Sequence, residues 1–212
     1  MSTAERRARE KVQRRQEILD AAREEFFERG FHTPTVDDVA TRAQVSKGTI
    51  YLYFASKEEI LAHLLIEGLE QLVDRLEDIY SAQVSSSPET ILRALASEYL
   101  AFAQENRSYF RLIMAFDRGR FEESISHELY QEVLDQSLSG LGILARSIEH
   151  GLAQGEFHVE DAWLAAGAAW AAMNGVMVLM GHPLRQRMIG ADLETMFHCT
   201  LDLVVAGLKD GR

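Results

Sequence analysis

Cysteine, proline and alternating runs of β-branched residues are scarce in this chain of 212 residues, and each scarcity excludes a class of protein. The single Cys199 cannot form a disulfide within the chain, and the charged start MSTAERRAREK has no signal-peptide pattern. We therefore expect a cytoplasmic location. Three prolines and the lack of alternating apolar and polar positions argue against a β-sheet, so an all-α fold is predicted.

Sequence motifs of catalysis are missing as well. The chain contains no G-x-S-x-G nucleophile motif, no phosphate-binding Walker loop and no H-E-x-x-H zinc motif. No pair spacing suited to a metal occurs among His127, His150, His158, His182 and His198. We expect no enzyme activity, no cofactor and no metal.

Negative charge is unevenly distributed along the chain. The formal net charge is −11, but residues 1–60 hold 11 basic and 11 acidic side chains, so the whole excess lies in residues 61–212. We divide the chain into a basic flexible arm (1–13), a small helical domain (14–60) and a larger helical domain (61–212). The arm is either a disordered solubilising tail or a contact to nucleic acid.

One apolar segment is about long enough to cross a bilayer. It reads AWLAAGAAWAAMNGVMVLMG, residues 162–181, and is nearly free of polar groups. Much of it is alanine and glycine, however, which contribute little transfer free energy, and no other segment resembles a span. We expect no membrane partner but a helix buried on all sides, in the core of the chain or in the interface with a partner.

The first helix is expected to end at Gly30. Ile18, Ala22 and Phe26 recur at helical spacing, and a left-handed glycine suits the C-terminus of such a helix.

Two short helices follow the first. Thr35 and Asp38 form a capping box for the second helix, which is about two turns long. Gln44 and Val45 make a tight turn, and Ser46 caps a third helix over residues 47–54. Two short helices joined by a tight turn and braced by a longer helix are typical of a helix-turn-helix.

The third helix presents a face suited to DNA. Ile50 and Phe54 point inward, so the helical period directs outward or to the flanks Lys47, Thr49, Tyr51, Leu52 and Tyr53. Gly48 lets the backbone approach another surface closely. A helix N-terminus with a lysine, hydroxyl groups and amphipathic rings suits contact with phosphates and base edges in a major groove. The two tyrosines have an alternative role as packing residues between helices.

The stretch from Thr35 to Leu61, with VSKGTIYLYFASKEEIL at its centre, resembles the DNA-binding domain of the TetR family of transcriptional regulators. The preceding FFERGF extends the resemblance over residues 14–65. The resemblance implies approach to bases and backbone by Lys47, Gly48, Thr49, Leu52 and Tyr53. It implies phosphate contacts by Thr35, Tyr51 and Lys57, although Lys57 is alternatively a solvated lysine. The sequence departs from the family at Gln44, where a glycine is common and a left-handed glutamine costs about 1 kcal/mol.

The remainder of the chain resembles the family only in its series of helices. We expect a long fourth helix from Lys57 through Leu76, a break at SSSP (85–88), a fifth helix from Pro88, and helices at about 109–116, 122–152, 161–180 and 191–208. In the family, the last two helices form a four-helix interface between two copies, so the resemblance implies a homodimer.

A regulator of this kind needs a ligand site in its larger domain. Candidates for an adaptable apolar pocket are Phe102, Tyr109, Phe110, Ile113, Met114, Phe116, Tyr130, Trp170, Met173, Asn174 and Met177. Some of these are expected to be ordinary core, and Asn174 alternatively bonds across a dimer interface. The sequence thus predicts a repressor released from a palindromic double-stranded DNA operator by a small lipophilic effector, neutral or cationic rather than phosphorylated. A helical protein-binding adaptor is the alternative, but it leaves residues 47–57 unexplained.

Overall fold

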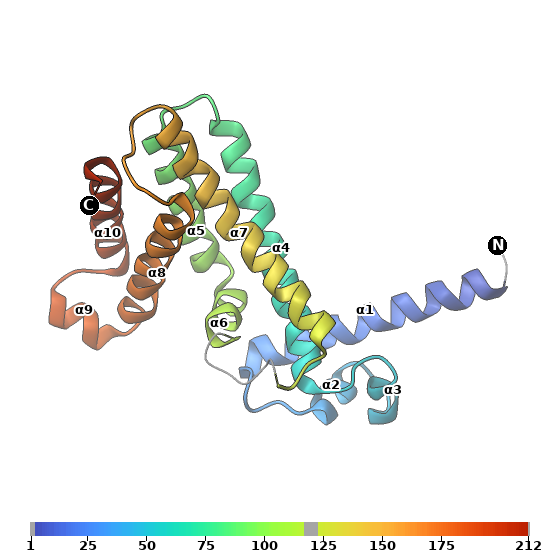
Figure 1. Ribbon diagram of the computed structural model, residues 1–212. Coiled ribbons are helices and arrows are strands. Elements are labelled where there is room, and N and C mark those ends of the chain that lie inside the picture. The colour runs from blue at the N-terminus through green and yellow to red at the C-terminus, as the bar shows by residue number, and fades with distance from the viewer. Residues whose placement is uncertain (1–2, 117–122, 212) are drawn as a thin grey trace. The chain divides into compact units, whose positions relative to one another are not determined.

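The computed structural model describes residues 3–116 and 123–211, which form ten α-helices and no strand (Figure 1). This confirms the predicted all-α fold. In chain order the helices are α1 (Thr3–Arg29), α2 (Val36–Arg42), α3 (Lys47–Tyr51), α4 (Lys57–Gln83), α5 (Pro88–Glu105), α6 (Arg107–Phe116), α7 (His127–Ala153), α8 (Ala162–Met180), α9 (Pro183–Ile189) and α10 (Leu193–Asp210).

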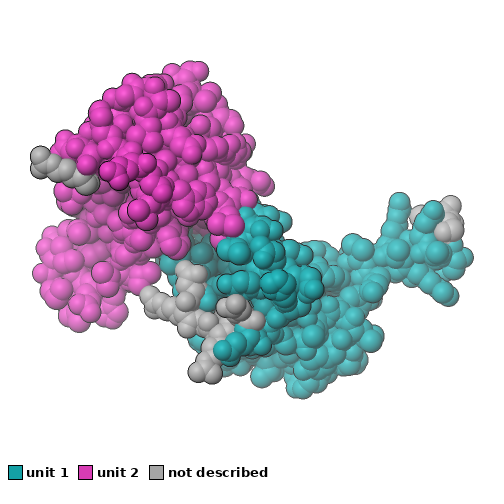
Figure 2. Space-filling view, viewed as in Figure 1, with its two compact units in different colours: residues 1–71, 103–136 teal, residues 72–102, 137–212 magenta. Residues whose placement is uncertain are grey.

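The chain divides into two compact units (Figure 2). Unit 1 contains Met1–Gln71 and Ala103–Gln136, and unit 2 contains Leu72–Phe102 and Ser137–Arg212. This division differs from the boundary expected after residue 60, because the N-terminal half of α4 contributes leucine and isoleucine side chains to the core that α1, α2 and α3 share. Helix α4 therefore begins in unit 1 and ends in unit 2.

The core of unit 1 forms around the apolar face of α1. Ile18 and Phe26 of α1 are fully buried, as is Ile50 of α3, and Phe54 after α3 is 1% exposed. Leu112 of α6 and one valine of α7 join the same cluster. These contacts explain why residues 103–136 belong to unit 1.

Helix α1 starts at Thr3, so the segment expected as a separate arm (1–13) is continuous with the first helix. Residues 3–14 are exposed, and their alanine, glutamate, lysine and arginine side chains favour a helix without burial. An ion pair between Arg6 and Glu10 at 3.4 Å adds surface support. Gly30 ends α1 with φ +82°, as the sequence predicts.

The turn between α2 and α3 requires a left-handed residue, and Gln44 supplies it with φ 55°. The Thr35 capping box of α2 and the Ser46 cap of α3 are both present, as expected. Helix α3 ends at Tyr51 rather than Phe54. The N–H of Leu52 bonds the carbonyl of Thr49, three residues earlier, so the last turn tightens and leaves the α-helical pattern.

Three features of the later helices differ from expectation. Helix α7 begins at His127, because the Ser126 hydroxyl accepts from the Leu129 N–H at 3.2 Å and caps the helix there. The expected start at residue 122 lies outside the described residues. Helix α6 begins two residues before the expected Tyr109. Helix α9 was not expected at all, although Pro183 at its start and Gly190 at its end are typical signals.

Unit 2 is organised around α8, which packs against α10. Its inward face carries small and flexible side chains, among them Ala166, Ala169 and Met173. Its other face is exposed, with Leu164 71% and Leu179 55% accessible. The expected burial on all sides is therefore incomplete within one chain, and an apolar face remains uncovered.

Candidate functional site

Helix α3 presents a cationic and apolar surface to solvent. The Ser46 hydroxyl accepts from the Thr49 N–H at 3.1 Å and fixes the start of the helix, while buried Ile50 fixes its orientation. Tyr51 is 48% and Leu52 77% exposed. Single exposed apolar side chains are common on soluble proteins, so this exposure leaves both side chains accessible without itself marking a site.

Lys47 stands at the first turn of α3 and is paired with α2. Its Nζ lies 2.8 Å from Asp37 Oδ2, and this hydrogen bond raises the pKa of Lys47. Both side chains are more than half exposed, so the pair contributes little stability. A phosphate oxygen can replace the Asp37 carboxylate at small cost, because the lysine is already in water.

The other predicted contacts on α2 and α3 have structural partners of their own. The Thr35 hydroxyl donates to Asp38 Oδ2 at 2.6 Å, and this bond, with others from the Thr35 backbone and Arg29, lowers the pKa of Asp38 to about 2. Thr49 shares a hydrogen bond of 2.8 Å with the Ser46 hydroxyl. Gly48 is exposed, and a side chain there would meet only the Ser46 hydroxyl at 3.7 Å. Tyr53 is half-buried against the core of unit 1, which matches its alternative role as a packing residue.

Lys57 has a second role that its sequence position did not reveal. Its Nζ donates to the His32 carbonyl at 3.0 Å and lies 5.6 Å from the centre of the Phe26 ring. Burial lowers the pKa of this lysine. Lys57 therefore ties the start of α4 to the segment after α1, and its contact with a phosphate stays a prediction.

A network of arginines and glutamates positions α2 on α1, and sequence analysis did not identify it. Arg42 Nε donates to Glu25 Oε2 at 2.8 Å, and the same guanidinium contacts Glu24 and Glu28. Glu25 is only 4% exposed and also bonds Arg29. A buried carboxylate with two arginine partners holds the helices at a fixed spacing.

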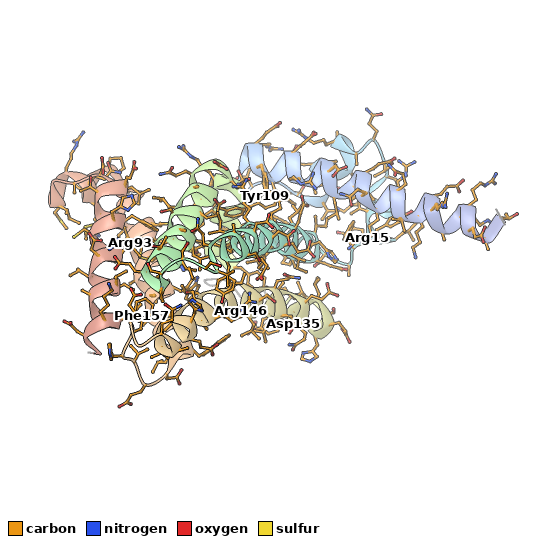
Figure 3. All side chains as sticks on the ribbon, turned by 90° about the horizontal axis from the view of Figure 1, so that it is seen from above. Arg15, Arg93, Tyr109, Asp135, Arg146 and Phe157 are labelled. Atoms are coloured by element: carbon orange, nitrogen blue, oxygen red, sulfur yellow. The ribbon has the colours of Figure 1, made fainter. Side chains whose placement is uncertain are left out.

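A second missed group joins α1 to α4. Arg15 lies on α1 (Figure 3). It donates to His63 Nε2 at 2.8 Å, and its guanidinium carbon lies 5.0 Å from the centre of the Phe54 ring. Burial and the charge of Arg15 lower the pKa of His63 to about 4. The residues lie far apart in sequence, so no local spacing could have shown the pair.

The predicted ligand residues are divided between the two units. Unit 1 holds Tyr109, Phe110, Ile113, Met114, Phe116 and Tyr130, and unit 2 holds Phe102, Trp170, Met173, Asn174 and Met177. Ile113 and Phe116 pack against the core of unit 1. Trp170 is 42% exposed at the edge of the buried face of α8. The sequence pattern had treated these residues as one group because it could not show that α6 packs on α1 and α4.

Tyr109 illustrates this packing. Its hydroxyl donates to Glu67, and its ring lies 4.8 Å from that of Phe27 in an edge-on arrangement. Burial and this hydrogen bond raise the pKa of Tyr109 to about 12. A Cβ on Gly68 would lie 2.6 Å from Tyr109 Cδ1, so the tyrosine needs a glycine opposite it.

Asn174 is the one predicted ligand residue with an unused polar atom in the interior of unit 2. The Tyr99 hydroxyl donates to Asn174 Oδ1 at 2.8 Å, while Asn174 Nδ2 is buried and has no hydrogen-bond partner within the described part of the chain. The residue is 9% exposed, with Met173 and Met177 beside it on the buried face of α8. A buried amide donor without an acceptor is uncommon in folded proteins, because it costs about 1–3 kcal/mol.

Unit 2 also has an open groove of about 470 Å³ that contains none of the predicted residues. Its lining includes Val73, Ile143 and Trp163 with the ion pair between Arg146 and Glu77. Over residues 3–116 and 123–211, no three His, Cys, Asp or Glu side chains are grouped as a metal site. Among the same residues α8 is long and apolar enough to span a membrane, but helices in the interior of soluble proteins have the same properties.

Comparison with known proteins identifies both halves of the chain. Residues 18–64 match the family described as "Bacterial regulatory proteins, tetR family", and residues 92–204 match "Tetracyclin repressor-like, C-terminal domain". The "Fatty acid metabolism regulator protein" of Bacillus subtilis is 41% identical over 140 residues, which are 64% of this chain and 71% of that protein. The "HTH-type transcriptional activator FasR" of Mycolicibacterium smegmatis is 31% identical over 105 residues, 50% of this chain and 47% of that protein.

Solved structures agree with this assignment. The transcriptional regulator FadR from Bacillus subtilis, solved in complex with stearoyl-CoA, superposes with a TM-score of 0.69 at 25% identity and covers 91% of this chain and 98% of its own. The relatives are transcriptional regulators, which confirms the prediction that the chain is not an enzyme. The chain belongs to the TetR family of DNA-binding transcriptional regulators.

Proposed function

We propose that this regulator is a repressor that binds a near-palindromic operator as a homodimer and leaves it when a lipophilic effector binds. The exposed face of α3 carries the DNA part of the proposal. Lys47 and Tyr51 on α3, and Leu52 directly after it, stand in solvent, and the position of the helix is fixed by the Ser46 cap and buried Ile50. A cation, a phenol and an apolar side chain match phosphates, base edges and thymine methyl groups.

The homodimer follows from the uncovered face of α8. Leu164, Trp170 and Leu179 are exposed on α8, and Leu203 is 70% exposed on α10. Several large apolar side chains exposed on two helices that pack together are unfavourable on a soluble monomer, whereas a second copy can cover them. Two copies also bring two α3 helices to successive major grooves, which require half-sites about one turn apart.

The effector proposal rests on Asn174 and on the relatives. A long acyl chain suits the methionines beside Asn174, and an acyl carbonyl can accept from the unused Asn174 Nδ2. A Bacillus subtilis relative named for fatty acid metabolism and a Bacillus subtilis FadR structure solved with stearoyl-CoA support a fatty acyl effector. Stearoyl-CoA carries phosphates, whereas the sequence favoured a neutral or cationic molecule. Free fatty acid and acyl-CoA must therefore be compared.

Release from DNA is expected to proceed through α4. This helix is continuous from Lys57, close in sequence to α3, to Gln83 in unit 2. An effector that prefers one position of α4 shifts the population toward that state. The shift is limited by its differential affinity, commonly about 1–3 kcal/mol.

The DNA proposal can be tested by selecting bound sequences from a pool of random duplexes. We expect a symmetric motif, and light scattering should give twice the chain mass of 23.9 kDa. Lys47→Ala should lower the dependence of log affinity on log salt by about one unit for each bound copy. A non-symmetric motif or a monomer would contradict the dimeric reading, and no DNA binding at low salt would favour the adaptor alternative.

The effector proposal needs a separate experiment. Stearate and stearoyl-CoA are titrated into the protein bound to the selected duplex, and release is followed by fluorescence anisotropy. Asn174→Leu should weaken the response to the effective compound by roughly 5- to 100-fold, because the acyl oxygen then loses its donor. DNA affinity without ligand should stay within about twofold. A variant that loses DNA binding without ligand would place Asn174 in the structural core instead.

A further inference from the structure

The face of α1 that is buried in the core of unit 1 becomes cationic toward the N-terminus, where the helix is exposed. Figure 2 shows this N-terminal end projecting from the rest of unit 1. Positions 7, 11, 14, 18 and 22 recur at spacings of three or four residues and therefore lie on one face. In the buried part this face carries Ile18 and Ala22, and in the exposed part it carries Arg7, Lys11 and Arg14.

We infer that this row, Arg7–Lys11–Arg14, is a second DNA contact that holds the phosphate backbone beside the site read by α3. The inference rests on the proposed binding of double-stranded DNA by α3. Its first support is the place where the row begins. Arg15, one residue after Arg14, contacts the Phe54 ring, and Phe54 follows α3 by three residues. The C-terminal end of the row therefore lies beside the segment that directly follows α3.

The second support is the pattern of ion pairs. Arg6 on the flank pairs with Glu10, and Arg14 pairs with Glu17 at 2.7 Å. Arg7 and Lys11 form no ion pair within the described part of the chain, although Glu5 and Glu10 are close in sequence. Alanines at positions 4 and 8 border the row and leave room for a close approach.

The reach of the row fits a DNA backbone. From Arg14 to Arg7 the helix rises by about 10 Å, which corresponds to about three base-pair steps along the duplex axis. The expected contact is independent of base sequence, because Lys and Arg side chains on phosphates position a protein without reading bases. The acidic residues of 61–212 on a second copy are the competing partner for this row.

The test compares two charge-matched variants, Arg7→Gln with Lys11→Gln on the row and Arg6→Gln with Arg9→Gln on other faces of the same turns. Each is titrated against the selected operator duplex in a long form, with about one helical turn of flanking DNA, and in a trimmed form. The row variant should lower the salt slope by about two units per bound copy and weaken binding at ~0.1 M salt by roughly 10- to 60-fold on the long form. The loss should be much smaller on the trimmed duplex and for the control variant.

Three outcomes would overturn the inference while leaving the proposed function in place, provided that wild type binds the trimmed duplex. Equal losses in both variants would indicate general attraction rather than a contact. A loss independent of duplex length would place the row away from the flanks. A fall in the mass of the protein on removing the row would assign it to a second copy. Circular dichroism of both variants should show unchanged helix content, since glutamine is a good helix former.

Discussion

Acidification should destabilise unit 1 through His63, and replacing this histidine with glutamine isolates the effect. Arg15 donates to His63 Nε2 at 2.8 Å, and burial together with the charge of Arg15 lowers the pKa from 6.5 to about 4. Glutamine keeps an oxygen that can accept from Arg15, but it cannot take up a proton.

The sign and size of the effect follow from proton linkage. Above pH 6.5, His63 is neutral in the folded and the unfolded chain and adds no pH dependence. Between pH 6.5 and about 4, the unfolded chain binds a proton that the folded chain does not, so the free energy of unfolding falls as the pH is lowered. The whole shift corresponds to ~3 kcal/mol, and the partial exposure of the ring reduces the expected loss to ~1–2 kcal/mol.

Chemical unfolding of wild type and His63→Gln at several pH values between neutrality and the folded pKa measures this loss. The carboxylates titrate in both proteins, so their effect cancels when the two free energies of unfolding are subtracted. As the pH falls, the free energy of unfolding of His63→Gln should rise by ~1–2 kcal/mol relative to that of wild type. His32→Gln, in an exposed position, reports the effect of removing a histidine elsewhere in unit 1. A difference that stays constant with pH would refute the argument that folded His63 resists protonation.

Further substitutions test the packing and the turn of unit 1. Gly68→Ala should lower the free energy of unfolding by about 2 kcal/mol, because the new Cβ meets the ring and Cβ of Tyr109. Thermal melting measures this loss, and an unchanged melting temperature would show that Tyr109 can move. Gln44 has φ 55°, which glycine adopts easily and valine does not. In urea unfolding, Gln44→Gly should therefore be at least about 1 kcal/mol more stable than Gln44→Val, and equal stabilities would contradict the left-handed turn. Arg42→Met should lower the free energy of unfolding by about 1–2 kcal/mol, because buried Glu25 then keeps only Arg29 as a partner. The surface control Arg6→Met should lower it by under about 0.5 kcal/mol in the same assay. Similar losses in the two variants would show that the network adds no stability.

Local signals in the sequence predicted the DNA-binding part of the fold well. The caps at Thr35 and Ser46 and the left-handed Gly30 are found where the residues indicated them. Such features depend on a few neighbouring residues and on backbone sterics, so spacing is enough to reveal them. The continuation of α1 to Thr3 was missed because basic composition alone does not distinguish an exposed helix from a coil.

Contacts between distant residues were beyond the reach of spacing. Glu25 reads as one of several surface glutamates, yet Arg42 and Arg29 make its burial possible. Tyr109 and Phe102 are both aromatic residues on apolar helix faces, and only the packing of α6 assigns them to different units. An apolar pattern shows that a side chain will be buried, but it does not show by which neighbour or whether a ligand takes part.

The internal pairing of arginines in unit 1 has a consequence for how the regulator finds its target. Arg23, Arg29 and Arg42 are each held by carboxylates of their own unit, so their charges are largely compensated before any DNA approaches. Attraction to arbitrary duplex depends almost entirely on uncompensated positive charge. These three arginines should therefore add little to binding of the many competing sequences of a genome, and that attraction falls mainly to the exposed basic residues at the start of α1. Occupancy of the operator against those sequences is then set by the ratio of the two affinities and not by the operator affinity alone.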